Sequence, residues 1–229
     1  MTPRLPNRHS AALLVVITMV CVVIAIWLFP KAQPTIALKQ ELTRDSAIEL
    51  ARAFAIAHQL PVNDTRVAVR FEQHAETQTF IELEAGGKPA VNAEVNRGDV
   101  SLFTWEVRFF RSGDPREVRI TLAPGGRVLG FQNILADADA RPALDSTQAM
   151  ARADSVRTSW LALSGPAWRP ISTSVKTVQP SGRLDRTLTW ERTDRKLGAA
   201  PLRIDIVVRG DRAGGARQYV KVPEPFLRR

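Results

Sequence analysis

The chain of 229 residues has few side chains that can form covalent cross-links or coordinate a metal. It contains one cysteine, Cys21, and three histidines, His9, His58 and His74. One cysteine cannot form a disulfide within the chain, so a folded module must be held together by its apolar core. The histidines are spread along the sequence, without an H-E-x-x-H motif or a His/Cys cluster. We therefore expect no metal site and no cofactor.

Acidic residues are also in deficit. The 23 aspartates and glutamates are outnumbered by 32 lysines and arginines, which gives a formal net charge of +9. Such a surface can attract anionic lipid, cell-envelope polymer or nucleic acid. The arginines are scattered singly through predicted strands and turns, whereas nucleic-acid-binding proteins gather them into a patch or stripe. We therefore expect no nucleic-acid partner, and binding of an anionic envelope polymer stays open as an alternative.

The sequence has only one long apolar run, Ala11 to Phe29, in which Thr18 is the only clearly polar residue. A helix of that length spans the roughly 30 Å hydrocarbon core of a bilayer. Trp27 suits the interfacial aromatic belt, Pro30 suits the end of the helix, and the small-residue pattern of a signal cleavage site is missing. We therefore predict an uncleaved transmembrane helix over 11–30 that contacts the bilayer through 11–29.

The orientation of this span rests on the basic residues around it. Their numbers are nearly equal on the two sides, because Arg4 and Arg8 precede the span whereas Lys31, Lys39 and Arg44 follow it. A short basic head before a first span usually stays in the cytoplasm. We therefore predict a single-pass cell-membrane protein with a cytoplasmic head at 1–10, a linker at 31–42 and an extracytoplasmic module.

The first part of that module, 43–140, has the pattern of a helix followed by an antiparallel meander. Thr43 is a suitable N-cap for a helix that runs to Leu60 with apolar residues at helical spacing. Alternating apolar and polar residues predict strands at 66–72, 81–84, 102–111, 117–122 and 127–134. Gly86 and Gly87 predict the start of a polar loop that runs to about Val100.

The second part, 141–229, repeats this order. Asp145, with Gln148 three residues later, has the signature of a capping box at the start of a helix that stops at Gly165. Strands are predicted at 171–178, 184–191, 202–209 and 218–222, with a glycine-rich turn at 210–215. The predicted fold is therefore α+β, with an N-terminal transmembrane helix followed by two tandem helix-plus-antiparallel-meander repeats.

The two halves can be aligned by short matching segments. Thr104-Trp105-Glu106 matches Thr189-Trp190-Glu191, and Arg119-Ile120 matches Arg203-Ile204 at nearly the same spacing. Two copies are too few for a solenoid. We therefore expect the two halves to pack against each other or to form adjacent lobes.

The repeated Trp-Glu pair offers the strongest candidate for chemistry. Glu106 and Glu191 would be an acid/base pair if they lay close together. In each predicted strand, however, the tryptophan lies on the apolar face and the glutamate on the opposite face. Cross-strand pairs of glutamate with arginine are common on sheet surfaces. We therefore interpret both carboxylates as surface residues.

The remaining candidates also have a structural interpretation. Ser172, Ser174 and Lys176 fall on one face of a predicted strand as exposed polar residues rather than as a Ser/Lys nucleophile. Gly125-Gly126 and Gly214-Gly215 are interpreted as hairpin turns, because neither is followed by the Lys-Ser/Thr of a phosphate loop. The sequence therefore predicts no catalytic, cofactor-binding or metal-binding residue.

The order of the segments LFTWEVRFFR, REVRITLAPGGRVLGF, RLDRTLTWER, RIDIVVRGD and YVKVPEPFLRR resembles the extracytoplasmic N-terminal region of bacterial CPBP-type (CAAX-protease-like) intramembrane proteases. The helix-plus-meander halves are similar to PepSY-type domains. The resemblance runs from about Leu42 to Arg229 and includes the preceding span. Such proteases carry paired glutamates followed by an arginine, with histidines in later spans. This chain has no Glu-Glu pair, so the resemblance transfers no catalytic residue.

These observations predict a non-enzymatic, membrane-anchored extracytoplasmic module with an interaction or regulatory role. Its partner would be a peptide or a membrane protein, and exposed strand edges are natural docking surfaces for peptides. The alternative that follows from the resemblance is an accessory N-terminal portion of a CPBP-type protease, truncated at Arg229 before the next membrane helix.

Overall fold

The computed structural model describes residues 8–32, 42–97 and 102–228. The apolar run forms helix α1 (Arg8–Ala32), in which Ala11–Leu28 has a mean hydropathy of 3.0 and is long enough to cross a membrane. It is the one helix of this kind in the described part of the chain. The helix continues two residues beyond Pro30, the predicted end, because the fixed φ of proline is itself helical. Most of the predicted head and linker lies outside the described residues.

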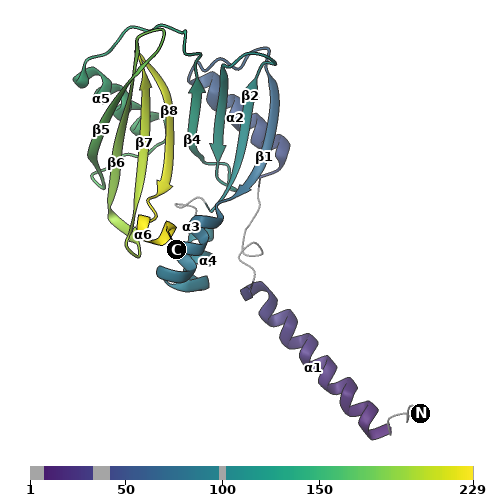
Figure 1. Ribbon diagram of the computed structural model, residues 1–229. Coiled ribbons are helices and arrows are strands. Elements are labelled where there is room, and N and C mark those ends of the chain that lie inside the picture. Colours follow the sequence, from purple (N-terminus) through teal and green to yellow (C-terminus); the bar gives the residue numbers. More distant parts are fainter. Residues whose placement is uncertain (1–7, 33–41, 98–101, 229) are drawn as a thin grey trace.

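The rest of the described chain forms one antiparallel sheet of eight strands, with helices on one face and further helices at one end of the sheet (Figure 1). The strands are β1 (Arg66–Gln73), β2 (Phe103–Phe110), β3 (Glu117–Leu122), β4 (Val128–Ile134), β5 (Trp168–Val178), β6 (Arg183–Leu197), β7 (Ala200–Arg209) and β8 (Arg212–Val220). The helices are α2 (Arg44–Ala57), α3 (Ala75–Glu84), α4 (Gly87–Arg97), α5 (Ser146–Ser155) and α6 (Glu224–Leu227), with a π-helical turn η2 (Val156–Trp160) after α5.

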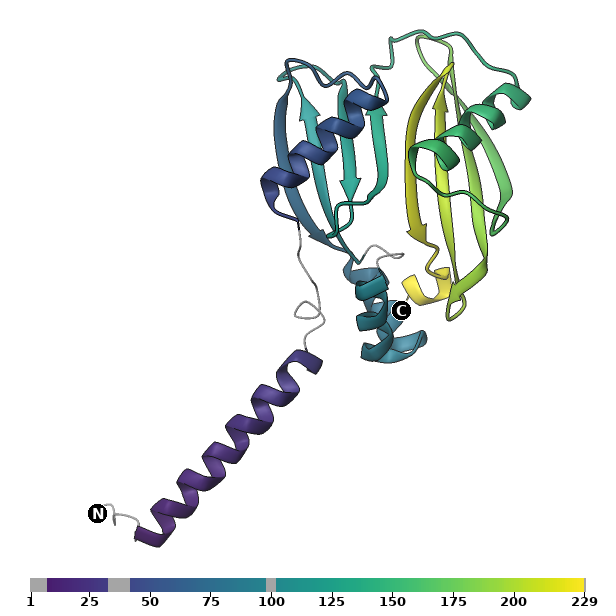
Figure 2. The same ribbon diagram turned by 180° about the vertical axis from the view of Figure 1, so that it is seen from behind.

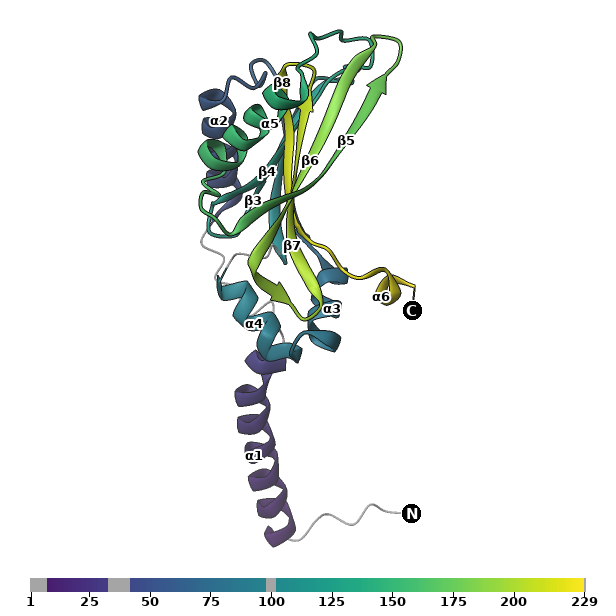
Figure 3. The same cartoon turned by 90° about the vertical axis from the view of Figure 1, so that its left-hand side faces the viewer.

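The strand order is β1-β2-β3-β4-β8-β7-β6-β5, so the last strands of the two halves pair at the centre of the sheet. Their antiparallel register pairs Gly130 with Arg217, Phe131 with Ala216, and Gln132 with Gly215. Helices α2 and α5 lie on the same side of the sheet (Figure 2). The opposite side, here called the open face, carries neither of them (Figure 3). The halves therefore lie edge to edge in one sheet, and one apolar cluster contains residues from both.

Both helix starts follow the sequence prediction. The Thr43 side chain accepts a hydrogen bond from the backbone N–H of Ser46 at the start of α2. At the start of α5, Asp145 and Gln148 form a complete capping box. These side chains satisfy backbone donors that have no partner within the helix. Both helices end earlier than expected, α2 at Ala57 and α5 at Ser155.

The strongest strand predictions are confirmed by alternating burial. The apolar face of β2 is buried, and the same pattern recurs in β7. The residues concerned are Phe103, Trp105, Val107 and Phe109 in β2, and Leu202, Ile204, Ile206 and Val208 in β7. Burying a large apolar side chain contributes about 1.5–3 kcal/mol. The core therefore lies mainly between the sheet and the helices on its covered face.

Residues 81–84 and 87–97 are helical, so the predicted strand at 81–84 and the described part of the loop predicted from Gly86 to about Val100 are wrong. Residues 81–84 belong to α3, and α4 fills most of the predicted loop. The sequence Ile-Glu-Leu-Glu alternates like a strand but is too short to distinguish the two periods. In the helix, Phe80 and Ile81 are both fully buried whereas Leu83 is 72% exposed. In α3, adjacent residues rather than every second residue therefore lie on the buried side, which is the pattern of a helix and not of a strand.

The end of the chain also differs from the prediction. Gly214 and Gly215 lie inside β8 rather than in a hairpin turn, and residues 224–227 form α6 after β8 ends at Val220. A Cβ on Gly215 would lie 3.0 Å from the carbonyl oxygen of Phe131 in β4. Glycine therefore permits close approach of two strands here.

The pairing of strands also shifts the alignment of the two halves. Trp105 pairs with Leu122, and Trp190 pairs with Ile204. When the two tryptophans are matched, Ile204 corresponds to Leu122. The match of Ile204 with Ile120 is therefore off by two residues.

Candidate functional site

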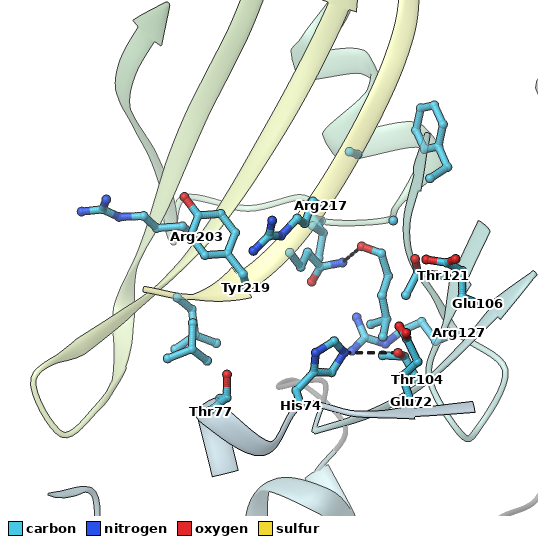
Figure 4. A pocket seen from close by; sticks show the side chains of 18 of the residues that line it. Glu72, His74, Thr77, Thr104, Glu106, Thr121, Arg127, Arg203, Arg217 and Tyr219 are labelled. Carbon is cyan, nitrogen blue, oxygen red and sulfur yellow. Dashed lines mark hydrogen bonds between the residues drawn. The ribbon is translucent and has the colours of Figure 1, made fainter. Parts of the chain in front are cut away.

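The two halves separate at one end of their junction. The β4–β8 pairing ends at Gly130 and Arg217, although β4 begins at Val128 and β8 continues to Val220. The side-chain Nε2 of Gln218 donates a hydrogen bond to the carbonyl oxygen of Leu129 at 2.9 Å and bridges the gap. We call this place the fork. It contains a pocket of about 410 Å³ lined by residues of both halves (Figure 4).

The second half lines the fork pocket with an ordered basic wall from β7 and β8. Arg203 donates to Oε2 of Glu191 from Nε at 3.0 Å and from Nη2 at 2.8 Å. Arg217 lies over the ring of Tyr219, with 5.0 Å between the guanidinium carbon and the ring centroid. The hydroxyl of Tyr219 donates to Asp205 at 3.3 Å. Burial, followed by the nearby Asp205 charge, raises the pKa of Tyr219, so the phenol is neutral at pH 7.

The first half lines the opposite side with strands β1 to β3. Arg70 holds two glutamates of this wall, with Nη1 2.9 Å from Oε1 of Glu72 and Nη2 3.0 Å from Oε1 of Glu106. Thr104 and Thr121 complete the wall between them. Arg70 itself does not line the pocket, so it fixes the two glutamates without occupying the space between the walls.

The start of α3 forms one end of the fork pocket (Figure 4). His74, the N-cap residue of α3, lies with Nε2 3.2 Å from Oγ1 of Thr104. Desolvation by burial is the main cause that lowers the pKa of His74. The positive charge of Arg217 acts in the same direction, and Glu72 opposes both. The imidazole is therefore neutral at pH 7.

Charges in the fork pocket are divided between the halves. The second half supplies guanidinium groups and no carboxylate, whereas every carboxylate comes from the first half. The charged lining residues are Glu72, Glu76, Glu106 and Arg127 from the first half, and Arg192, Arg203 and Arg217 from the second. A ligand in this pocket therefore meets carboxylates mainly on one side and guanidiniums on the other.

The two glutamates considered from the sequence do not form an acid/base pair. Glu106 lies in β2 and Glu191 in β6, with four strands between them. Neighbouring strands are roughly 4.8 Å apart, so these carboxylates are far too distant to act on one substrate atom. Glu106 instead contacts Arg70, and Glu191 contacts Arg203. Only Glu106 lines the fork pocket.

The pair His74–Thr104 has the residue types of a base and a nucleophile. Thr104, however, is only 1% exposed. A nucleophile must reach a bound substrate, and this hydroxyl is enclosed by the wall of the pocket. The contact therefore orients the histidine and holds the start of α3 against β2.

The other candidate residues lie away from the fork. His58 stacks on Trp160 with ring centroids 4.1 Å apart, and burial lowers its pKa. Ser172, Ser174 and Lys176 are exposed on β5, as expected from the sequence. The side chain of His9 lies outside the described residues. In the described ranges, no group of three or more His, Cys, Asp or Glu side chains is placed to hold a metal ion.

Sequence reasoning missed the basic wall of the fork pocket. Arg203 and Arg217 looked like scattered surface arginines, because the β4–β8 junction that places them in the same pocket as Glu106 joins distant parts of the chain. One signal was present in the sequence. Tyr219 is the only tyrosine, and it lies in a strand with Arg217 two residues before it.

Comparison of this chain with family models, with curated proteins and with solved structures gave no match.

Proposed function

We propose that this chain is a membrane-anchored, non-enzymatic binding module, and that its fork pocket holds a short peptide carrying both a cationic and an anionic group. The observation that carries the proposal is the division of charge across the fork. Glu72 and Glu106 attract a cation on one side, while Arg203 and Arg217 attract an anion on the other. A ligand with both groups would satisfy both walls.

The size of the pocket supports a ligand of this class. Small-molecule sites usually enclose about 300–1,000 Å³, and the fork pocket encloses about 410 Å³. Ion pairs with residues outside the pocket lining also fix charged groups of both walls before a ligand arrives. Arg70 holds Glu106, and Glu191 holds Arg203. Such preorganisation lowers the conformational cost of binding.

The enclosed Thr104 and the separation of Glu106 from Glu191 support a binding role rather than catalysis. We further propose that the two halves are copies of one PepSY-like unit. Each has a side-chain-capped helix before four strands, and the strand order is symmetric about the β4–β8 junction. A regulatory module that senses peptides near a membrane protein would use both the binding role and the duplicated architecture.

The single apolar helix α1 has the length and composition of a membrane anchor or a signal sequence. We propose that it is an uncleaved anchor with the amino terminus in the cytoplasm. A reporter that is active only outside the cytoplasm, fused after Arg229, should then be active in intact cells. Activity of a cytoplasmic reporter alone at the same position would reverse the orientation.

Calorimetry with the full-length chain in detergent tests the binding proposal. Triglycine, which carries both end charges, should bind, whereas N-acetyl-triglycine and triglycine amide should each bind at least about tenfold more weakly, since each lacks one charged hydrogen-bonding group. Glu106→Gln should weaken triglycine binding and Arg228→Gln, a change of an exposed residue outside the pocket lining, should not. Equal binding of the free and capped peptides, or no binding of any, would overturn the proposal.

A further inference from the structure

The outermost strand of the second half, β5, is an unpaired sheet edge. β5 has 11 residues and pairs with β6 alone, at the end of the strand order. Every residue from 169 to 177 is exposed. Figures 1 and 3 show β5 at the margin of the sheet, on the side away from the fork. Its outer backbone groups are therefore available to another strand.

The other edge strand, β1, is protected in the usual ways. It is shorter, with 8 residues, and its burial alternates. Its Arg70 is engaged in ion pairs with Glu72 and Glu106, and Phe71 stacks on Phe103 with ring centroids 6.0 Å apart. Charged residues and short length discourage strand addition at a sheet edge. β5 has Pro170, a register shift after it, and Lys176, but the five residues between Pro170 and Lys176, Ile171–Val175, are uncharged and exposed.

The chemistry of a partner strand follows from the charges that flank this segment. The sequence contains no acidic residue between Asp154 and Asp185. Arg169 and Lys176 are exposed, and among the described residues neither makes an ion pair with a carboxylate. Their cross-strand neighbours, Glu191 and Asp185, are already held by other arginines: Arg203 contacts Glu191 and Arg183 contacts Asp185, each at 2.8 Å. The edge therefore has uncompensated positive charge on both flanks.

A second copy of this chain fits the edge poorly. In an antiparallel pair of two β5 strands, Arg169 of one copy would lie near Lys176 of the other. Like charges opposite each other destabilise a strand pair. An extended segment with carboxylates at alternate positions has the complementary charge and places those carboxylates on one face.

We propose that β5 is a strand-addition site for an acidic, extended segment of a partner protein. The partner strand pairs with the outer backbone groups of β5, and its carboxylates face Arg169 and Lys176. Main-chain hydrogen bonds supply affinity in this mode, and the side chains select the partner. Trp168, the first residue of β5, lines the fork pocket, but residues 169–177 do not, so the exposed edge is a different surface from that pocket.

The test uses the full-length chain in nanodiscs of zwitterionic lipid and an end-capped, fluorescently labelled eight-residue peptide with glutamate at alternate positions. Two further peptides have lysine in place of glutamate, or N-methylated backbone amides. The double variant Arg169→Gln/Lys176→Gln is compared with Arg44→Gln/Arg228→Gln. The second pair lowers the net charge equally at exposed residues outside β5. Fluorescence anisotropy reports binding, and light scattering reports the oligomeric state.

The acidic peptide should bind, and the lysine and N-methylated peptides should lose most of that binding. Each exposed charge contributes about a two- to fivefold change in affinity, so the β5 double variant should bind about four- to twenty-five-fold more weakly. The Arg44/Arg228 variant should bind as the parent chain does. Failure of the acidic peptide to bind, equal binding of the lysine or N-methylated peptide, or equal loss in both double variants would overturn the proposal. A dimer that competes with the peptide would assign the edge to a second copy instead.

Discussion

Gly130 of β4 and Ala216 of β8 approach so closely that a Cβ built on Gly130 would lie 2.3 Å from the carbonyl oxygen of Ala216. This contact lies at the end of the short β4–β8 pairing that joins the two halves, where the fork begins. No side chain larger than hydrogen fits there without moving one backbone from the other. The junction between the halves, and the pocket beneath it, therefore depend on this glycine.

Gly130→Ala should destabilise the chain by about 2–4 kcal/mol, because the added methyl group must push β4 and β8 apart. Gly125→Ala is the matched control. A Cβ at Gly125 meets no atom within 4 Å, so this change should stay within about 0.5 kcal/mol. Guanidinium unfolding followed by tryptophan fluorescence measures both. Equal stability of the two variants would contradict the account of the junction.

Glu117→Gln should destabilise the chain by about 1–2 kcal/mol, because it removes a charge from between two arginines. Glu117 is buried on the open face and accepts hydrogen bonds from Arg108 and, at 2.6 Å, from Nε of Arg119. Both guanidiniums keep some access to water, which limits the loss. Glu224→Gln, at an exposed pair, should change the free energy of unfolding by less than about 0.5 kcal/mol. An unchanged denaturation midpoint for Glu117→Gln would mean that the contacts of Glu117 with Arg108 and Arg119 do not stabilise the fold.

Asp145→Ala should destabilise the chain by about 1 kcal/mol, because it removes the side chain that caps α5. Thr147→Ala, an exposed change in the same turn without a capping role, is the control. Thermal unfolding of the two variants should differ by several degrees. Indistinguishable melting curves would mean that packing of α5 on the sheet, rather than its cap, sets its stability.

Stability should fall as the pH drops from about 7.5 to 5.5. Burial lowers the pKa values of His58 and His74 in the folded chain below the unfolded value of 6.5. The unfolded chain then takes up protons first as the pH falls through 6.5 towards the folded pKa values, which favours unfolding. The double variant His58→Gln/His74→Gln cannot be protonated at these positions, so its melting temperature should depend less on pH. An equally steep loss of stability in that variant would mean that groups other than these two histidines cause the pH dependence.

Local signals in the sequence were sufficient for much of the fold. Alternation in β2 and β7 predicted which residues are buried, and Thr43 and Asp145 predicted the helix starts. The segment 81–84 misled because four residues fit a strand and a helix equally well. Burial by distant contacts, here of Phe80 and Ile81 in one apolar cluster with residues of β7 and β8, decides such cases.

The candidate site was less predictable than the fold. Its two walls come from halves whose strands pair only through β4 and β8, and periodicity within either strand contains no information about that pairing. Glu106 was recognised as a candidate, but it was paired with Glu191, its equivalent in the second half. The pocket instead contains Arg203 and Arg217 on the other side of the β4–β8 junction. Gly214 and Gly215 were assigned to a turn, because a glycine that permits close approach has the same local signature as one that turns the chain.

The central claim is that a ligand with both charges enters the fork pocket, and Tyr219 reports on this directly. It is the only tyrosine of the chain and lies in the basic wall beside Arg217. A full-length chain labelled with ring-¹³C tyrosine should give one tyrosine signal set, and triglycine titration should shift it to saturation. N-acetyl-triglycine and triglycine amide should leave it nearly unchanged at equal concentration. A tyrosine signal that stays in place throughout the triglycine titration would contradict the claim.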